Sequence, residues 1–155
     1  MKIRWEERGA GMPLLLIQGL GYGRWGWEPI VSGLAERHRG LFFDNRGIGE
    51  SDKPVDGSYS FPFFERALDG FVEHLDAPTV DLVVHDLGGP VGLFWAASHP
   101  ERVRRLALLN TIVYPQLSWA VIVFMAASRL PGIRSLLTSP RGLAWVMSFG
   151  VARPL

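Results

Sequence analysis

An aspartate stands at the end of a short apolar run, just where a helix is expected to begin. Residues 80–95 read VDLVVHDLGGPVGLFW, and the apolar part stops at His85 and Asp86, directly before Leu87 and a glycine pair. This layout is typical of a nucleophile on a sharp strand-to-helix turn, where small neighbours allow the chain to bend. A carboxylate in that position can attack an electrophilic carbon and form a covalent ester.

Helix capping is the simpler interpretation of Asp86, because aspartate is a favoured residue at a helix N-cap and its charge suits the helix dipole. Capping explains an aspartate here, but it does not explain the pair Gly88-Gly89 that follows. It also does not explain why the loop Gln18-Gly19 is expected on the same side of the sheet. We therefore favour Asp86 as a nucleophile.

The elements that must position Asp86 follow from the alternation of apolar runs and helical patterns. Strands that lack polar alternation and are joined by helices indicate a mainly parallel sheet covered on both faces. The expected fold class is α/β, with a doubly wound sheet. Strands are expected at 2–7, 14–17, 41–44, 80–84 and 105–110, and helices at 25–37, 63–75 and 88–98.

The pattern changes after Asn110, where only helices are expected. We expect residues 1–110 to form the N-terminal part of a core and residues 111–155 to form the start of a helical cap. The apolar stretch 117–128 is shorter than the roughly 18–20 residues that span a bilayer, so a buried or lid helix is favoured over an interfacial one. The cap helices are expected at 117–129, 132–138 and 140–149.

The composition excludes several classes of function. The chain has 155 residues, of which 48% are hydrophobic and 20% are charged, as in a soluble domain of ordinary size. A net charge of +1 with scattered arginines does not indicate a nucleic-acid partner. The absence of cysteine excludes disulfides, thiol catalysis and thiolate metal sites, and it is compatible with a cytoplasmic location.

Two more polar junctions follow strands, at the edge where open parallel sheets bind ligands. In the first, Gly21, Gly23 and Gly26 have the spacing of a dinucleotide fingerprint, and Asp44 ends the next strand. Bulky residues between these glycines argue against a close pyrophosphate. We rank a loop whose backbone N–H groups face a developing negative charge first, a plain glycine-rich strand-to-helix turn next, and a nucleotide site last.

The second junction, FFDNRGIGESDKP, contains no residue that stands out as a catalyst. Its glycines allow tight turns. We expect a loop held by local hydrogen bonds of Asp44, Arg46 and Ser51.

Together these segments resemble the α/β-hydrolase superfamily over nearly the whole chain. PLLLIQGLG resembles the strand and oxyanion loop, with Gln18 where the family usually has His. FFDNRGIGESDKP is similar to the Asp-x-Arg-Gly-x-Gly-x-Ser loop, and HDLGGPVGLFWAASHPERVRRLALLN resembles the elbow, its helix and the next strand. The elbow aspartate and the bulky Val84 most resemble the haloalkane dehalogenases. Epoxide hydrolases are the alternative within the superfamily.

The resemblance implies a two-step reaction on a small hydrophobic substrate, without a cofactor or metal. Asp86 would displace halide from carbon, and a histidine-activated water would hydrolyse the ester. The backbone N–H groups of Leu20 and Leu87 would form the oxyanion or halide hole, with Gln18 and Asn110 in supporting positions. Dehalogenases usually bind halide with a Trp and an Asn at the two leucine positions, so weak halide binding is expected.

Other aromatic residues are not expected to replace these donors. Tyr114, the only tyrosine after the elbow, is not placed where epoxide hydrolases bind the epoxide oxygen. Core packing is the favoured interpretation of the other tryptophans considered, namely Trp25, Trp27, Trp95, Trp119 and Trp145.

None of the chain's four histidines is assigned as general base. His38 and His74 fall in helical segments, His99 lies at the far end of the elbow helix, and the side chain of His85 should diverge from that of Asp86. The resemblance places the acid and the base after the cap. We therefore expect these residues to be a fragment or relic of a longer hydrolase, inactive alone. A non-catalytic binding protein that kept the fold is the alternative from another class.

Overall fold

The computed structural model describes residues 2–19, 21–55, 59–113, 119–137, 139–142 and 144–145. The chain divides into two units, Met1–Val113 and Tyr114–Leu155. The first unit contains the sheet and the Asp86 turn, so it carries the candidate site.

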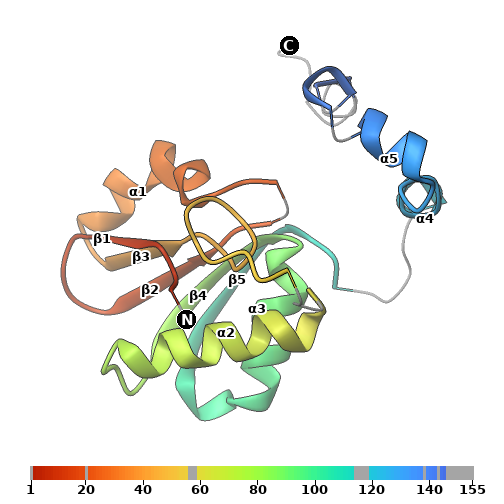
Figure 1. Cartoon of the computed structure of the whole chain (residues 1–155). Coiled ribbons are helices and arrows are strands. Elements are labelled where there is room, and N and C mark those ends of the chain that lie inside the picture. Colours follow the sequence, from red (N-terminus) through yellow and green to blue (C-terminus); the bar gives the residue numbers. More distant parts are fainter. Residues whose placement is uncertain are drawn as a thin grey trace. The chain divides into compact units, whose positions relative to one another are not determined.

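The sheet of the first unit has the strand order β1-β3-β2-β4-β5. Strand β1 is antiparallel to β3, and the other neighbours are parallel (Figure 1). The carboxyl ends of β2, β3, β4 and β5 therefore lie at one edge, and the predicted α/β class with a mainly parallel sheet is confirmed. The strands are β1 Trp5–Arg8, β2 Pro13–Ile17, β3 Arg39–Phe43, β4 Val80–Asp86 and β5 Val103–Thr111.

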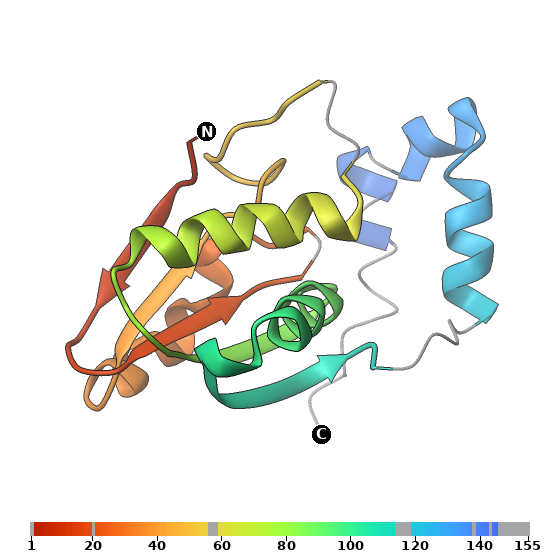
Figure 2. The same ribbon diagram turned by 90° about the horizontal axis from the view of Figure 1, so that it is seen from below.

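Helices cover the two faces of this sheet, as expected for a doubly wound arrangement. Helix α1 packs on one face, and α2 and α3 pack on the other (Figures 1 and 2). Successive residues of the fully buried β2 point to opposite faces of the sheet. Leu14 and Leu16 pack in the cluster with α1, while Leu15 and Ile17 pack in the cluster with α2 and α3. The helices are η1 Arg24–Trp27, α1 Glu28–Ala35, α2 Phe61–His74, α3 Gly88–Ser98 and η2 Pro100–Arg102.

Two predicted boundaries were wrong for local reasons. The helix predicted at 25–37 is a short 3₁₀ turn followed by α1, with Pro29 in the first turn of α1, where its missing N–H costs no hydrogen bond. The strand predicted at 2–7 begins only at Trp5, because the backbone of residues 2–4 is bonded to a loop instead. Lys2 N–H donates to Asp52 Oδ2 at 2.6 Å, and Arg4 N–H donates to Ser51 Oγ at 2.9 Å.

Strand β5 differs from the other parallel strands in its exposure and register. Leu106, Leu108 and Leu109 are 38%, 43% and 41% exposed. The pairing with β4 shifts by one residue at two places, which leaves Arg104 and Asn110 without a direct partner across the ladder. In the described part of the chain, β5 pairs with β4 alone.

The second unit contains α4 Trp119–Ala127 and α5 Pro131–Leu137. Helical residues continue at 140–142 and 144–145, and the rest of the helix predicted at 140–149 lies outside the described residues, as does Tyr114. In the described ranges, no helix combines the length and apolar character needed to cross a membrane. The interpretation of residues 111–155 as a cap stays a prediction.

Candidate active site

The turn between β4 and α3 holds Asp86 in a left-handed backbone conformation, with φ of +52°. Helix α3 begins at Gly88, and Leu87 before it already has helical dihedrals, with φ of −71° and ψ of −10°. Asp86 thus directly precedes the helical residues, but its positive φ differs from the extended backbone of an ordinary N-cap. A side chain held at positive φ between a strand and a helix is the backbone arrangement of a nucleophile elbow.

Close backbone packing explains the glycines that follow Asp86. A Cβ atom at Gly88 would lie 2.5 Å from the carbonyl oxygen of Ile17, and a Cβ at Gly89 would overlap the Thr111 side chain. One turn later, a Cβ at Gly92 would lie 2.5 Å from Cγ1 of the fully buried Val84. The glycines thus let α3 approach the ends of β2 and β5, as a sharp turn requires.

The loop after β2 lies against Asp86. A Cβ at Gly19 would overlap the Asp86 carboxyl group, so the absence of a side chain at Gly19 makes room for the candidate nucleophile. The structure therefore brings together Gln18-Gly19 and Asp86, as predicted. Leu20, whose backbone N–H was predicted to line the anion hole, lies outside the described residues.

Gln18 connects this loop to two neighbouring strand ends. Its side chain is buried, and its Oε1 lies 3.2 Å from Nδ1 of His85. Asn45, just after β3, donates from Nδ2 to the Gln18 carbonyl at 3.1 Å. The sequence predicted a supporting role for Gln18 but not these two partners. Both contacts fix the loop beside the Asp86 turn.

Asn110 lies near the carboxyl end of β5, and its supporting role stays a prediction. Asn110 sits at the irregularity of β5 with φ of +37°, and Asp86 pairs across the ladder with Thr111. The Thr111 hydroxyl donates to the Asp86 carbonyl at 2.6 Å. Thr111, which the sequence analysis did not single out, therefore fixes the backbone of the turn from the β5 side.

The contacts and positions of the other three histidines are those of structural residues. His99 stacks on Trp95 and lies 3.4 Å from Asp69, at the far end of α3 from Asp86. His74 ends α2, while His38 lies in the turn before β3 rather than in the predicted helix. The turn follows from the early end of α1 at Ala35.

Asp44 is a fully buried carboxylate that organises the loops around the first two junctions. It accepts hydrogen bonds from Arg24 N–H at 2.6 Å, from the Arg24 guanidinium at 2.7 Å and from Glu50 N–H at 2.9 Å. Ser51 Oγ donates to its carbonyl at 2.6 Å. Such a buried, occupied carboxylate is not available to a ribose, which contradicts the nucleotide interpretation.

Ion pairing shapes the surroundings of this carboxylate. The pKa of Arg24 is raised, first by its hydrogen bond with Glu6 and then by the charge of Asp44.

Arg46 departs from the predicted loop network. Its guanidinium lies over the ring of Phe63, 4.3 Å from the centroid, instead of binding the loop.

The tryptophan predictions divide between the two units. Trp27 and Trp95 are buried, as expected for core residues, and Trp95 Nε1 donates to Asp69. Trp25 is 60% exposed, because η1 turns its side chain toward Tyr22 instead of the core. Trp119 and Trp145 are also exposed, so core packing was the wrong interpretation for these three.

A cavity of about 330 Å³ lies at the carboxyl edge of the sheet, beside the Asp86 turn. Both Gly19 and Leu87, the neighbours of the Asp86 side chain and backbone, line it. Its wall is mostly aromatic and aliphatic, which suits an apolar ligand. The remaining lining residues are Gln18, Asn45, Arg46, Gly47, Ile48, Tyr59, Phe61, Phe64 and Val91.

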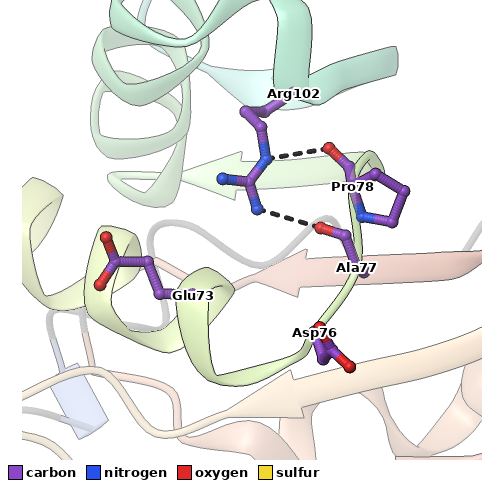
Figure 3. Close-up of a pocket in the computed structure, with 5 residues that line it drawn as sticks. All are labelled: Glu73, Asp76, Ala77, Pro78 and Arg102. Atoms are coloured by element: carbon purple, nitrogen blue, oxygen red, sulfur yellow. Dashed lines mark hydrogen bonds between the residues drawn. The ribbon is translucent and has the colours of Figure 1, made fainter.

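A second, larger cavity of about 560 Å³ lies near the amino ends of β4 and β5 (Figure 3). Its Arg102 guanidinium donates to the carbonyls of Ala77 and Pro78 at 3.0 and 2.9 Å. The arginine thus ties together two connections of the sheet. Glu73 and Asp76 complete the lining. This end of the sheet contains neither Asp86 nor its partner loop, so the smaller cavity is the candidate active site.

Comparison with known proteins identifies the family. Residues 12–140 match the family described as alpha/beta hydrolase fold. The chain therefore belongs to the α/β-hydrolase fold family, as the three sequence segments indicated.

The individual similarities are to enzymes of several activities. A cis-3-alkyl-4-alkyloxetan-2-one decarboxylase of Shewanella oneidensis is 34% identical over 113 residues, covering 71% of this chain and 36% of the relative. A soluble epoxide hydrolase of Corynebacterium sp. is 32% identical over 113 residues, covering 72% and 38%. The crystal structure of haloalkane dehalogenase DatA from Agrobacterium tumefaciens superposes with a TM-score of 0.84 and 30% identity, covering 99% of this chain and 54% of that one. The chain thus spans little more than a third of the length of the two curated relatives.

Proposed function

We propose that this chain carries the nucleophile of an α/β-fold hydrolase that acts through an aspartyl ester on a small apolar substrate, in the manner of a haloalkane dehalogenase. The observation that carries the proposal is the placement of Asp86 at positive φ, with its carboxyl group against Gly19 and its turn beside an apolar cavity. An aspartate is stable in this backbone conformation only where the surroundings enforce it.

In the first step, a carboxylate oxygen of Asp86 forms a bond to an sp³ carbon of the substrate. The carbon–halogen bond breaks, and the halide leaves with its electron pair. In the second step, a general base takes a proton from water, and the hydroxide attacks the ester carbonyl to release an alcohol and the carboxylate. The Leu87 and Leu20 backbone N–H groups would stabilise negative charge.

The side chain of Leu87 lines the cavity without a hydrogen-bond donor. A halide would therefore find no side-chain donor at position 87, and poor activity on chloroalkanes is the expected outcome. Opening of a strained ring, such as an epoxide, is the second candidate. The similarity to a soluble epoxide hydrolase and to a decarboxylase named for an oxetanone supports it.

The test is covalent trapping at Asp86. The protein is incubated with a reactive alkyl bromide or an epoxide and digested, and the peptide that contains Asp86 is examined by mass spectrometry. We expect one alkyl or hydroxyalkyl ester on Asp86, absent in Asp86→Asn. Esters only on other carboxylates, or equal labelling of the exposed Glu73 and of Asp86, would contradict the proposal and favour a non-catalytic binding protein.

A further inference from the structure

The candidate active-site cavity contains one cationic side chain whose donors are not used. Among the residues that the structure describes, the Arg46 guanidinium donates no hydrogen bond and forms no ion pair, and its Nε is buried without a partner. The three other polar side chains of the lining are occupied, because Gln18 bonds His85, Asn45 bonds the Gln18 carbonyl, and the Tyr59 hydroxyl donates to the Pro54 carbonyl.

Aromatic packing holds Arg46 in this position. Its guanidinium covers the ring of Phe63, which is 6% exposed, and Phe63 in turn packs against Tyr59 and Phe64 at ring separations of 5.2 and 5.3 Å. A cation over a ring is stabilised by the ring electrons, and stacking through its flat face leaves the N–H groups at its edge able to bind another group. The side chain therefore lies over Phe63 without an anionic partner among the described residues.

The rest of the wall determines what such a partner would look like. Tyr59, Phe61 and Phe64 contribute aromatic surface, and Ile48, Leu87 and Val91 contribute aliphatic surface. A buried polar group that lacks a partner is costly, and a planar guanidinium matches a carboxylate with two parallel hydrogen bonds. A ligand with an apolar body and one carboxylate would satisfy both parts of the cavity.

We propose that Arg46 is the carboxylate-binding residue of this cavity, and that the substrate of the proposed Asp86 reaction is an apolar carboxylic acid. The inference on substrate class rests on the proposed function. The negative charge of Asp86 would disfavour a second carboxylate beside it, so the substrate carboxylate would bind at Arg46 and present its other end to the turn. Arg46 would thereby orient the substrate.

The experiment compares two unreactive probes of the same shape, 3-phenylpropionate and its neutral amide, by NMR titration of the isotope-labelled full chain. In the wild-type protein the acid should bind more tightly than the amide and shift the resonances of Arg46 and Tyr59. Arg46→Met should weaken the acid about ten-fold or more and leave the amide within about two-fold, because a hydrogen-bonded charge pair is lost. Arg66→Met, which removes an exposed arginine of α2 that does not line the cavity, should change neither.

Arg46→Lys provides a second test if the methionine variant folds poorly. It keeps the charge but loses the planar pair, so intermediate binding of the acid is expected. Equal binding of acid and amide, weakening of both by the same factor in Arg46→Met, or no binding of either at millimolar concentration would overturn the proposal. Tighter binding of inorganic phosphate than of the acid would overturn it as well.

The outcome is separable from that of the proposed function. The titration requires no bond formation, and Asp86→Asn should retain binding of the acid. The trapping experiment uses neutral reagents, which do not depend on Arg46. A carboxylate site without an Asp86 ester, or an ester without a carboxylate site, would therefore identify which of the two ideas failed.

Discussion

The backbone of Asp86 is the residue-scale feature with the clearest energetic consequence. Residues with a side chain seldom adopt positive φ, because Cβ then crowds the following carbonyl group, at a cost of roughly 1–2 kcal/mol. Asp86 adopts φ of +52° and is followed by residues whose close packing fixes the turn. The turn therefore stores strain at the residue that we propose reacts.

This strain predicts an unusual order of stability at position 86. The free energy of unfolding of Asp86→Gly should be about 1 kcal/mol higher than that of Asp86→Ala, because only glycine adopts positive φ without a steric cost. Both variants lack the carboxyl group, so its lost contacts cancel in the comparison. The free energies are measured by urea unfolding of the two proteins.

A helical position provides the control for this comparison. At Glu73 in α2, alanine should be more stable than glycine by about 1 kcal/mol, which is the usual order inside a helix. If alanine also equals or exceeds glycine at position 86, then the turn in solution does not hold a positive φ and its description as an elbow is wrong.

At the scale of elements, the paired strands β4 and β5 contain a buried carboxylate, that of Asp81. Asp81 is 3% exposed and accepts two hydrogen bonds from Arg104, the first of the two residues that β5 leaves without a direct ladder partner. These hydrogen bonds, and then the positive charges nearby, lower the pKa of Asp81 below its ordinary value, against the opposing effect of burial. The irregularity in the strand thus provides the arginine for a buried acid.

A lowered pKa in the folded state predicts how this contact depends on pH. Its stabilisation should be complete above the unfolded-state pKa, near 3.8, and should disappear as pH falls through the lower folded-state value. The free energy of unfolding of Asp81→Asn should therefore be lower than that of the wild type at pH 7. This difference should shrink as the pH falls below the unfolded-state pKa of Asp81. Urea unfolding at pH 7 and at pH 3 or lower measures this difference.

The control for this pH effect is Glu7→Gln. Arg39 also lowers the pKa of Glu7, but the Glu7 side chain is 35% exposed and that of Asp81 only 4%, so solvent screening should leave a smaller difference in unfolding free energy at pH 7. If the difference in unfolding free energy between the wild type and Asp81→Asn is the same at all pH values, then the amide destabilises the protein through its shape and not through the loss of charge.

The elements show what local patterns can and cannot predict. Unbroken apolar runs predicted β2, β3 and β4, because a strand buried on both faces has no other pattern, and the glycines after Asp86 predicted the turn. Contacts between distant residues were not predictable, since no local pattern records that Gln18 meets His85 or that Thr111 bonds the Asp86 backbone.

The same limit applied to the loops. The motif after β3 predicted a tight loop, and Asp44 and Ser51 do hold it. The position of Arg46 in the motif predicted that it would hydrogen-bond the loop. Its observed contact is instead with Phe63, which lies on α2. Only the packed structure brings an aromatic ring from the next helix under that guanidinium.

At the scale of the whole molecule, exposed apolar surface occurs in both units. In the first unit part of it lies on β5, whose far edge carries no partner strand within the described residues. In the second unit it lies on α4, where Ile122 and Val123 are 54% and 58% exposed. Exposed strand edges and apolar patches favour association between molecules.

We expect the 155-residue chain to self-associate, mainly through β5, since a strand edge adds backbone hydrogen bonds to apolar contact. Leu108→Lys places a charge on this strand and should shift the protein toward monomer in size-exclusion chromatography with light scattering. Ile122→Lys on α4 is the matched variant. A larger shift with Ile122→Lys would assign the association to the second unit, and no shift with either would contradict the expectation.

The buried carboxylate of Asp44 has a consequence for how the loops open. The amide protons of Arg24 and Glu50, 26 positions apart in the sequence, bond the two oxygens of that one carboxyl group at 2.6 and 2.9 Å. Either loop can leave only by exposing a charge shared with the other, so the two should open as one cooperative unit. In native-state hydrogen exchange, these two amides should have similar protection and respond alike to denaturant. The rim of the candidate cavity formed by Asn45–Ile48 would then be governed by a single opening event.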